Sequence, residues 1–168
     1  DLAAKAIDEM LAKHPKSAYT VEANRILARS CAALGAKEGN PEKKEALFGR
    51  AIGAMNRALK FVKPTDKKMR TEVELEIAEI YELKGDKPKA ASACQRILMF
   101  TDAADATLRT YIEKAFEKGV PLMLELENYD GVIENCRKYR KEFPGGRATQ
   151  RAISWEEKAA TARDSAPK

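Results

Sequence analysis

The side chains with the clearest spacing for chemistry are four glutamates at helical intervals, Glu72, Glu76, Glu79 and Glu82. These intervals place them along one side of a helix, and paired carboxylates can act as general acid and base. The only histidine, His14, precedes the helix-ending Pro15, so we expect it to be exposed. No nucleophile, metal or phosphate-binding motif accompanies the glutamates. We therefore predict a protein that is not an enzyme, with no catalytic residue and no cofactor.

Three cysteines, Cys31, Cys94 and Cys136, could suggest a metal site or a disulfide. Their wide separation matches no local zinc-ligand spacing. We expect each thiol to be buried and to pack as a small apolar side chain, with no bound metal. Unpaired cysteines favour a reducing compartment such as the cytoplasm. A periplasmic or membrane-tethered location is the alternative, and the compartment stays unassigned.

The charge balance permits nucleic-acid binding without requiring it. The chain has 31 Lys and Arg against 26 Asp and Glu, a net charge of +5 and a pI near 9.1. Its basic residues are dispersed, and the densest run, from Arg137 to Lys141, suits a helix end that complements the helix dipole. A nucleic-acid-binding helical repeat is therefore the alternative function, disfavoured because the four glutamates would repel phosphates.

The elements that must position these residues are predicted to be helices throughout. Ala, Leu, Glu, Lys and Arg are abundant, no strand-like alternation occurs, and no apolar stretch reaches the roughly 18 residues of a membrane span. We expect no direct membrane insertion by this segment. The predicted helices lie near residues 2–14, 18–35, 41–62, 67–84, 87–100, 105–127, 130–142 and 147–162.

A repeated register indicates how these helices pack. A small or apolar residue, followed by apolar or small residues at offsets four, seven and usually eight and then by a helix stop, occurs from Ala3, Ala51, Ala90 and Val132. These offsets place one apolar stripe on one helical face, which a lone helix cannot bury. Neighbouring copies must therefore bury the stripe by stacking, as in a helical repeat protein.

One segment carries a family resemblance. Residues 71–104 have the length of one tetratricopeptide repeat. Ile77, Ala78 and Tyr81 occupy the large, small and aromatic packing positions of its first helix, and Gly85-Asp86 forms the turn. The chain thus resembles the tetratricopeptide repeat family. The resemblance implies an all-α fold, a right-handed superhelix of stacked antiparallel helix pairs with about three repeats plus flanking helices.

The resemblance predicts a single domain over residues 1–163, made of several repeats. It comprises a half repeat at 1–17, repeats near 21–65, 71–104 and 105–146, and a terminal helix at 147–162, with a tail at 164–168. Extra residues at 36–46 contain Gly39-Asn40-Pro41, a helix start expected to lengthen the next helix. The first helix of the last repeat is expected to extend back over 105–112 and to bend at Pro121.

Two smaller expectations concern the origin of the chain. The opening residues match only the second half of a repeat, which predicts a segment taken from a longer protein. The following Lys16-Ser17-Ala18-Tyr19 resembles a turn in tetratricopeptide proteins of the bacterial cell envelope. This turn favours a bacterial, envelope-type member of the family.

The family resemblance also implies a function. First helices of successive repeats line a concave groove, so we expect a protein-interaction scaffold that binds a peptide or helical segment of a partner within a larger assembly. Self-association through the ends of the stack is left open. The predicted groove residues are Arg25, Arg29, Glu72, Glu76, Glu79, Glu82, Lys114, Glu117 and Leu124.

Two alternatives accompany these assignments. Arg25 and Arg29 can instead pair with Glu72 and Glu76 and serve solubility alone. Trp155, the only tryptophan, either covers the core of the last repeat or forms a terminal docking site with Arg151, since Trp and Arg are frequent anchors of interfaces.

Overall fold

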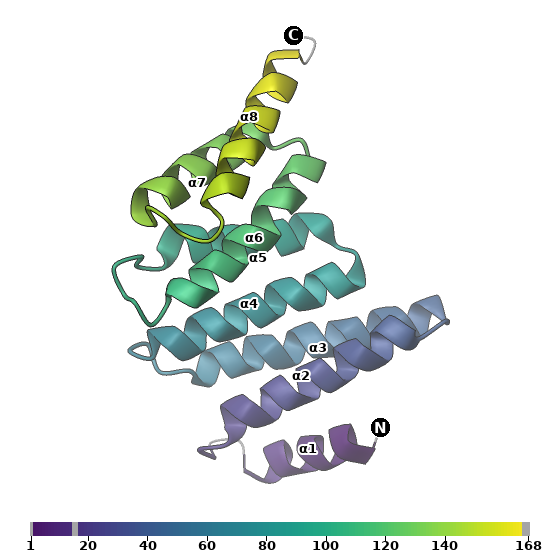
Figure 1. The fold of residues 1–168 in the computed structure, drawn as a ribbon. Helices are drawn as coiled ribbons and strands as arrows, with labels where there is room; N and C mark the ends of the chain where they lie inside the picture. Colours follow the sequence, from purple (N-terminus) through teal and green to yellow (C-terminus); the bar gives the residue numbers. More distant parts are fainter. Residues whose placement is uncertain (1, 15–16, 166–168) are drawn as a thin grey trace. The chain divides into compact units, whose positions relative to one another are not determined.

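The computed structural model describes residues 2–14 and 17–165 (Figure 1), and these form α-helices without any strand. The all-α prediction is confirmed. Pro15 and Lys16 of the predicted turn, together with residues 166–168 of the predicted tail, lie outside the described residues. No helix in the described ranges is long and apolar enough to cross a membrane. The helices are α1 (Leu2–Lys13), α2 (Thr20–Lys37), α3 (Pro41–Phe61), α4 (Lys67–Lys84), α5 (Lys87–Phe100), α6 (Arg109–Glu125), α7 (Tyr129–Glu142) and α8 (Thr149–Ser165).

The chain divides into two compact units, residues 1–86 and 87–168. The boundary falls inside the predicted repeat at 71–104, directly after the turn at Gly85. Gly85 has a φ of 85°, and the amide of Asp86 donates to the carbonyl oxygen of Tyr81 over 2.9 Å. Glycine reaches this left-handed conformation without strain, so the predicted end of α4 at Gly85 is confirmed.

The first unit is built around the antiparallel pair α2 and α3, which lie side by side along most of their length (Figure 1). Helix α1 packs on α2, and α4 packs on both α2 and α3. The side chain of Asn40 accepts a hydrogen bond from the amide of Lys43 over 3.0 Å, and Pro41 is the first residue of α3. The extra residues therefore lengthen α3 to 21 residues, as predicted.

The core of this unit consists of apolar side chains from α2, α3 and α4. Leu27, Phe48, Met55 and Val73 are fully buried there. Cys31 on α2 is a fully buried free thiol, which confirms the expectation that it is part of the core.

The second unit pairs α5 with α6 and α7 with α8, and α6 also contacts α7 and α8. Helix α6 begins at Arg109, so the predicted extension over 105–112 is confirmed for residues 109–112 and wrong for residues 105–108. The carboxylate of Asp105 accepts from the amide of Thr107 over 3.0 Å and from its hydroxyl over 2.6 Å. This local turn competes with helix formation and delays the start of α6. The helix then continues through Pro121 to Glu125.

Stacked rings form the centre of the second unit. The rings of Phe116 and Tyr139 lie 4.2 Å apart and nearly parallel, with Phe143 5.2 Å from Tyr139 and Trp155 5.7 Å from Phe116. Offset aromatic pairs add roughly 0.5–1.5 kcal/mol beyond the burial of their area. Through Trp155, α8 is tied to the core of α6 and α7.

The buried thiol of Cys136 gives the second unit a testable pH dependence. Burial, with a smaller contribution from Glu156, raises the pKa of Cys136 from 9.0 to about 12. The thiol therefore ionises at lower pH in the unfolded chain than in the folded one. The buried neutral thiol therefore contributes fully to the free energy of unfolding below pH 9. This contribution falls by about 1.4 kcal/mol per pH unit as the pH rises from 9 toward 12.

We expect the free energy of unfolding of Cys136→Ala to fall less at alkaline pH than that of the wild type. Urea unfolding of both proteins at about pH 8 and about pH 10 checks it, because the wild type should lose about 1.4 kcal/mol more than the variant between the two conditions. Equal losses in the two proteins would show that the thiol is not shielded from water in the fold.

Candidate functional site

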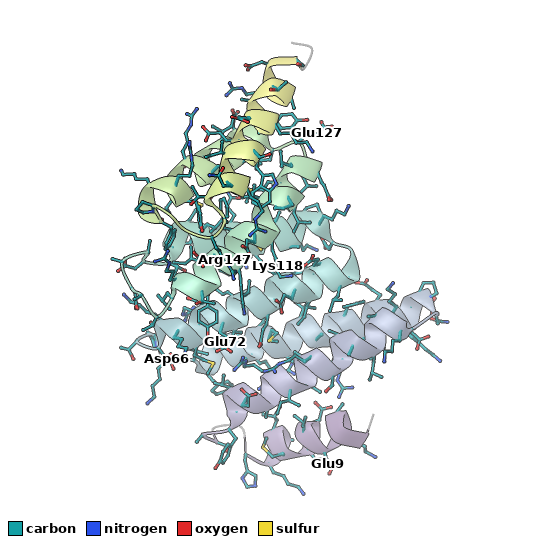
Figure 2. The ribbon with its side chains drawn as sticks, viewed as in Figure 1. Glu9, Asp66, Glu72, Lys118, Glu127 and Arg147 are labelled. Atoms are coloured by element: carbon teal, nitrogen blue, oxygen red, sulfur yellow. The ribbon has the colours of Figure 1, made fainter. Side chains whose placement is uncertain are left out.

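The predicted groove residues of α2 and α4 form one ionic network, in which Arg25 is the central side chain. Arg25 is only 5% exposed. Its guanidinium donates to Glu76 over 3.0 and 2.7 Å in a two-pronged contact, to Glu72 over 2.8 Å and to Glu22 over 2.9 Å. Nη1 also lies 3.4 Å from the sulfur of Met69. We call this set the Arg25 network; Glu72, at the start of α4, is labelled in Figure 2.

The electrostatics of the network explain why a buried guanidinium is tolerated. Hydrogen bonding to Glu76, with further contributions from the charges of Glu76 and Glu72, raises the pKa of Arg25 against the opposing effect of burial. Arg29 is half exposed and reaches Glu22 over 3.3 Å and Glu76 over 3.5 Å. The structure therefore brings Arg25 and Arg29 together with Glu72 and Glu76, as in the pairing alternative.

The two remaining predicted groove residues of α4, Glu79 and Glu82, lie beyond this network. Glu79 is half-buried and Glu82 is exposed, one and two turns further along the helix from Glu76. Because Arg25 is buried and fully engaged, the α2–α4 face offers few unpaired groups to a partner at this point. The Arg25 network therefore acts mainly to join α4 to α2.

A second ionic network joins α6 to α8 with the signs reversed. Glu117 pairs with Arg151 and, over 2.9 Å, with Arg147, while Glu113 lies 3.5 Å from Arg147. The hydroxyl of Tyr139 donates to the largely buried Glu113 over 3.2 Å. Arg147, just before α8, is labelled in Figure 2. Two predicted site residues, Glu117 and Arg151, thus meet in one contact, whereas the predicted Lys114 is exposed on α6.

Beside this second network lies an open hollow of about 290 Å³. We call it the Trp155 hollow. Trp155 is half-buried, with one side toward Phe116 and the guanidinium of Arg151 5.9 Å from its ring centroid. The residues that line the hollow come from α6, α7 and α8: Pro121, Leu124, Glu125, Tyr129, Trp155, Lys158 and Ala162.

The Trp155 hollow unites two residues that the sequence suggested separately, Leu124 as a groove residue and Trp155 as a docking residue. Trp155 covers Phe116 and remains partly exposed, and its role in docking stays a prediction. Sequence reasoning missed Tyr129 and Lys158. Their signal is weak, because Tyr129 resembles a turn residue and Lys158 one of many surface cations.

The chemistry of the Trp155 hollow suits an apolar side chain with a charged neighbour. Its walls are mostly aromatic and aliphatic, which favours ligands that bury apolar surface on binding. Glu125 on the lining is paired with Lys87 over 2.7 Å, so its charge is already balanced. Among the described residues no group of three or more His, Cys, Asp or Glu is placed to hold a metal ion.

No family model, curated protein or solved structure matches this chain. Its function must therefore be inferred from its own residues. Of the two inter-helix faces, α2–α4 is closed by a buried ionic network, whereas α6–α8 combines a similar network with an accessible apolar hollow. The second face is the better candidate for binding.

Proposed function

We propose that this protein is a non-enzymatic interaction scaffold of tetratricopeptide-like helix pairs, which binds a peptide or helical segment of a partner within a larger assembly. The observation that carries this function is the Trp155 hollow. There the only tryptophan of the chain stays accessible beside Leu124 and Tyr129. Trp and Tyr contribute large apolar area with a polar edge, which makes them frequent anchors of protein interfaces.

Helix packing within each unit supports the repeat character. In the first unit α2 contacts its antiparallel partner α3 and also α4, the helix that follows the pair. In the second unit α6 contacts α7 and also α8 in the same order. Such contacts are expected where first helices of successive pairs lie next to each other, the arrangement that lines a groove in the tetratricopeptide family.

The size of the Trp155 hollow sets the expected affinity. A hollow of about 290 Å³ accommodates one or two side chains rather than a long segment. Burying one leucine or phenylalanine side chain contributes about 1.5–3 kcal/mol. We therefore expect weak binding by a single anchor, with orientation set by charges such as Lys158 at the hollow.

Trp155 allows a direct test of this function. Peptides that bind the full chain are selected from a displayed library of random sequences. Each selected peptide is then titrated into the protein while the fluorescence emission of Trp155 is recorded. Because the chain has one tryptophan, a change in emission reports on this hollow or its immediate surroundings. Failure to select any peptide, or selected peptides that leave the emission unchanged, would refute the binding site proposed here.

Leu124→Ala should weaken the binding of selected peptides by about tenfold, because it removes apolar wall from the hollow. Leu126→Ala is the matched control. Leu126 also lies at the end of α6 and is 39% exposed, but it does not line the hollow. We expect that variant to bind within about twofold of the wild type. Equal weakening by both substitutions would indicate damage to the helix end rather than a lost contact.

A further inference from the structure

A larger open hollow, of about 660 Å³, lies in the first unit where three helix ends meet. We call it the Phe61 hollow. The start of α2, the end of α3 and the start of α4 enclose it. Its lining residues are Ser17, Ala18, Val21, Phe61, Val62, Lys63, Asp66 and Met69.

The walls of the Phe61 hollow are mostly apolar. Val62 is buried at its base, whereas Phe61 remains 44% exposed at the edge. Tyr19, adjacent in sequence to the lining residue Ala18, is 73% exposed. Large apolar side chains left this accessible beside a concavity gain stability when a ligand covers them, at about 25 cal/mol per Å² of apolar area.

The segment that supplies Phe61, Lys63 and Met69 to the hollow is strongly basic in sequence. Between residues 60 and 70 the only acidic residue is Asp66, and its carboxylate already accepts from the amide of Met69 over 3.0 Å at the start of α4. Within residues 2–14 and 17–165, none of the cations in this stretch pairs with a carboxylate. These exposed cations are Lys60, Lys63, Lys67, Lys68 and Arg70.

The ionic network next to the Phe61 hollow offers it no free carboxylates from Glu22, Glu72 or Glu76. Met69, on the lining, contacts Arg25 through its sulfur over 3.4 Å. The hollow therefore adjoins the Arg25 network, whose carboxylates on Glu22, Glu72 and Glu76 all bind guanidinium groups. A ligand in the hollow meets mostly apolar walls and the unpaired Lys63, with further unpaired cations next to it in sequence.

We propose that the Phe61 hollow binds an acidic peptide segment that inserts one large apolar side chain, its carboxylates facing Lys63 and the neighbouring lysines. The concavity distinguishes this ligand from a lipid surface, because a flat bilayer cannot fill a hollow with a single projecting group. This hollow lies in a different unit from the Trp155 hollow, so its ligand is additional to the one proposed above.

The test uses the full chain and three labelled peptides. The first carries one phenylalanine flanked by glutamates, the second replaces the glutamates by glutamines, and the third replaces the phenylalanine by alanine. Fluorescence anisotropy should show binding of the first peptide, weakening as salt rises. Each of the other two should bind about tenfold more weakly.

Variants locate the binding. Lys63→Glu with Lys67→Glu should weaken the first peptide by about tenfold, since two attractive charges become repulsive. Lys43→Glu with Lys44→Glu, at the other end of α3, makes the same change in net charge and should bind within about twofold of the wild type. Leu124→Ala should also leave this affinity unchanged, which separates the Phe61 hollow from the Trp155 hollow. Circular dichroism confirms that each variant is folded.

Several outcomes would overturn the assignment. If the glutamine peptide bound as tightly as the glutamate peptide, the lysines would have no role in binding. If Lys43→Glu with Lys44→Glu weakened binding as much as Lys63→Glu with Lys67→Glu, the effect would be one of net charge alone. Phosphatidylserine vesicles and a single-stranded oligonucleotide are tested in parallel. The surface would be assigned to lipid or nucleic acid instead if one of these bound, if Lys63→Glu with Lys67→Glu abolished that binding, and if the acidic peptide did not bind.

Discussion

Arg25→Ala is expected to lower the free energy of unfolding by about 3 kcal/mol, whereas Arg29→Ala should lower it by less than about 1 kcal/mol. Arg25 is 5% exposed and binds three carboxylates from two helices. Its removal leaves Glu76, whose side chain is 15% exposed, beside Glu72 without their principal counter-charge. Arg29 is half exposed, so water replaces its contacts at little cost.

Urea unfolding followed by circular dichroism measures both effects. Arg25→Lys provides an intermediate case, because an ammonium keeps the charge but cannot make the two-pronged contact with Glu76. We expect its loss of stability to fall between those of the two alanine variants. If Arg25→Ala and Arg29→Ala were equally mild, the Arg25 network would be a solvated surface cluster and would not hold α4 against α2.

Gly119→Ala should destabilise the second unit by about 2 kcal/mol, although alanine normally favours a helix. A Cβ atom at Gly119 would lie 2.7 Å from the Cβ of Cys94. That distance is far below contact, and the Cβ of Cys94 is fixed to its backbone. Helices α5 and α6 would therefore have to separate, which disturbs packing around both.

Gly49→Ala is the matched control for this effect. Gly49 is exposed within α3, and a Cβ atom there would meet nothing within 4 Å. We expect this substitution to stabilise the protein by about 0.5–1 kcal/mol. The opposite signs, read from urea unfolding, separate contact from helix propensity. A stabilising Gly119→Ala would show that α5 and α6 are not closely packed at this point.

The helices could be predicted because their signals are local. Asn40-Pro41 starts α3 and Gly85 ends α4 through hydrogen bonds within a few residues, so neighbouring residues suffice to define them. The late start of α6 was missed because the turn at Asp105 competes with a helical register that continues across it. Burial of Cys94 and Cys136 was expected from the repeated register, and burial of Cys31 from the packing position that the family resemblance implies.

The candidate sites could be predicted only in part, since they depend on contacts between distant residues. Pairing of Arg25 with Glu76 was foreseen as one of two readings, but no sequence rule decides between a buried pair and a solvated one. The Phe61 hollow was missed entirely. It arises where three helix ends leave space, and its only sequence signal is an apolar residue, Phe61, at a helix end among lysines.

The buried cysteines allow local opening to be measured separately in each unit. Cys31 lies in the first unit, and Cys94 and Cys136 lie in the second; all three are shielded from solvent. A thiol reagent can reach them only when the surrounding helices open, so labelling rates under native conditions report the free energy of local opening. One rate shared by all three would mean that the units open as a single cooperative block. A separate rate for Cys31 would mean that each half of the chain fluctuates on its own.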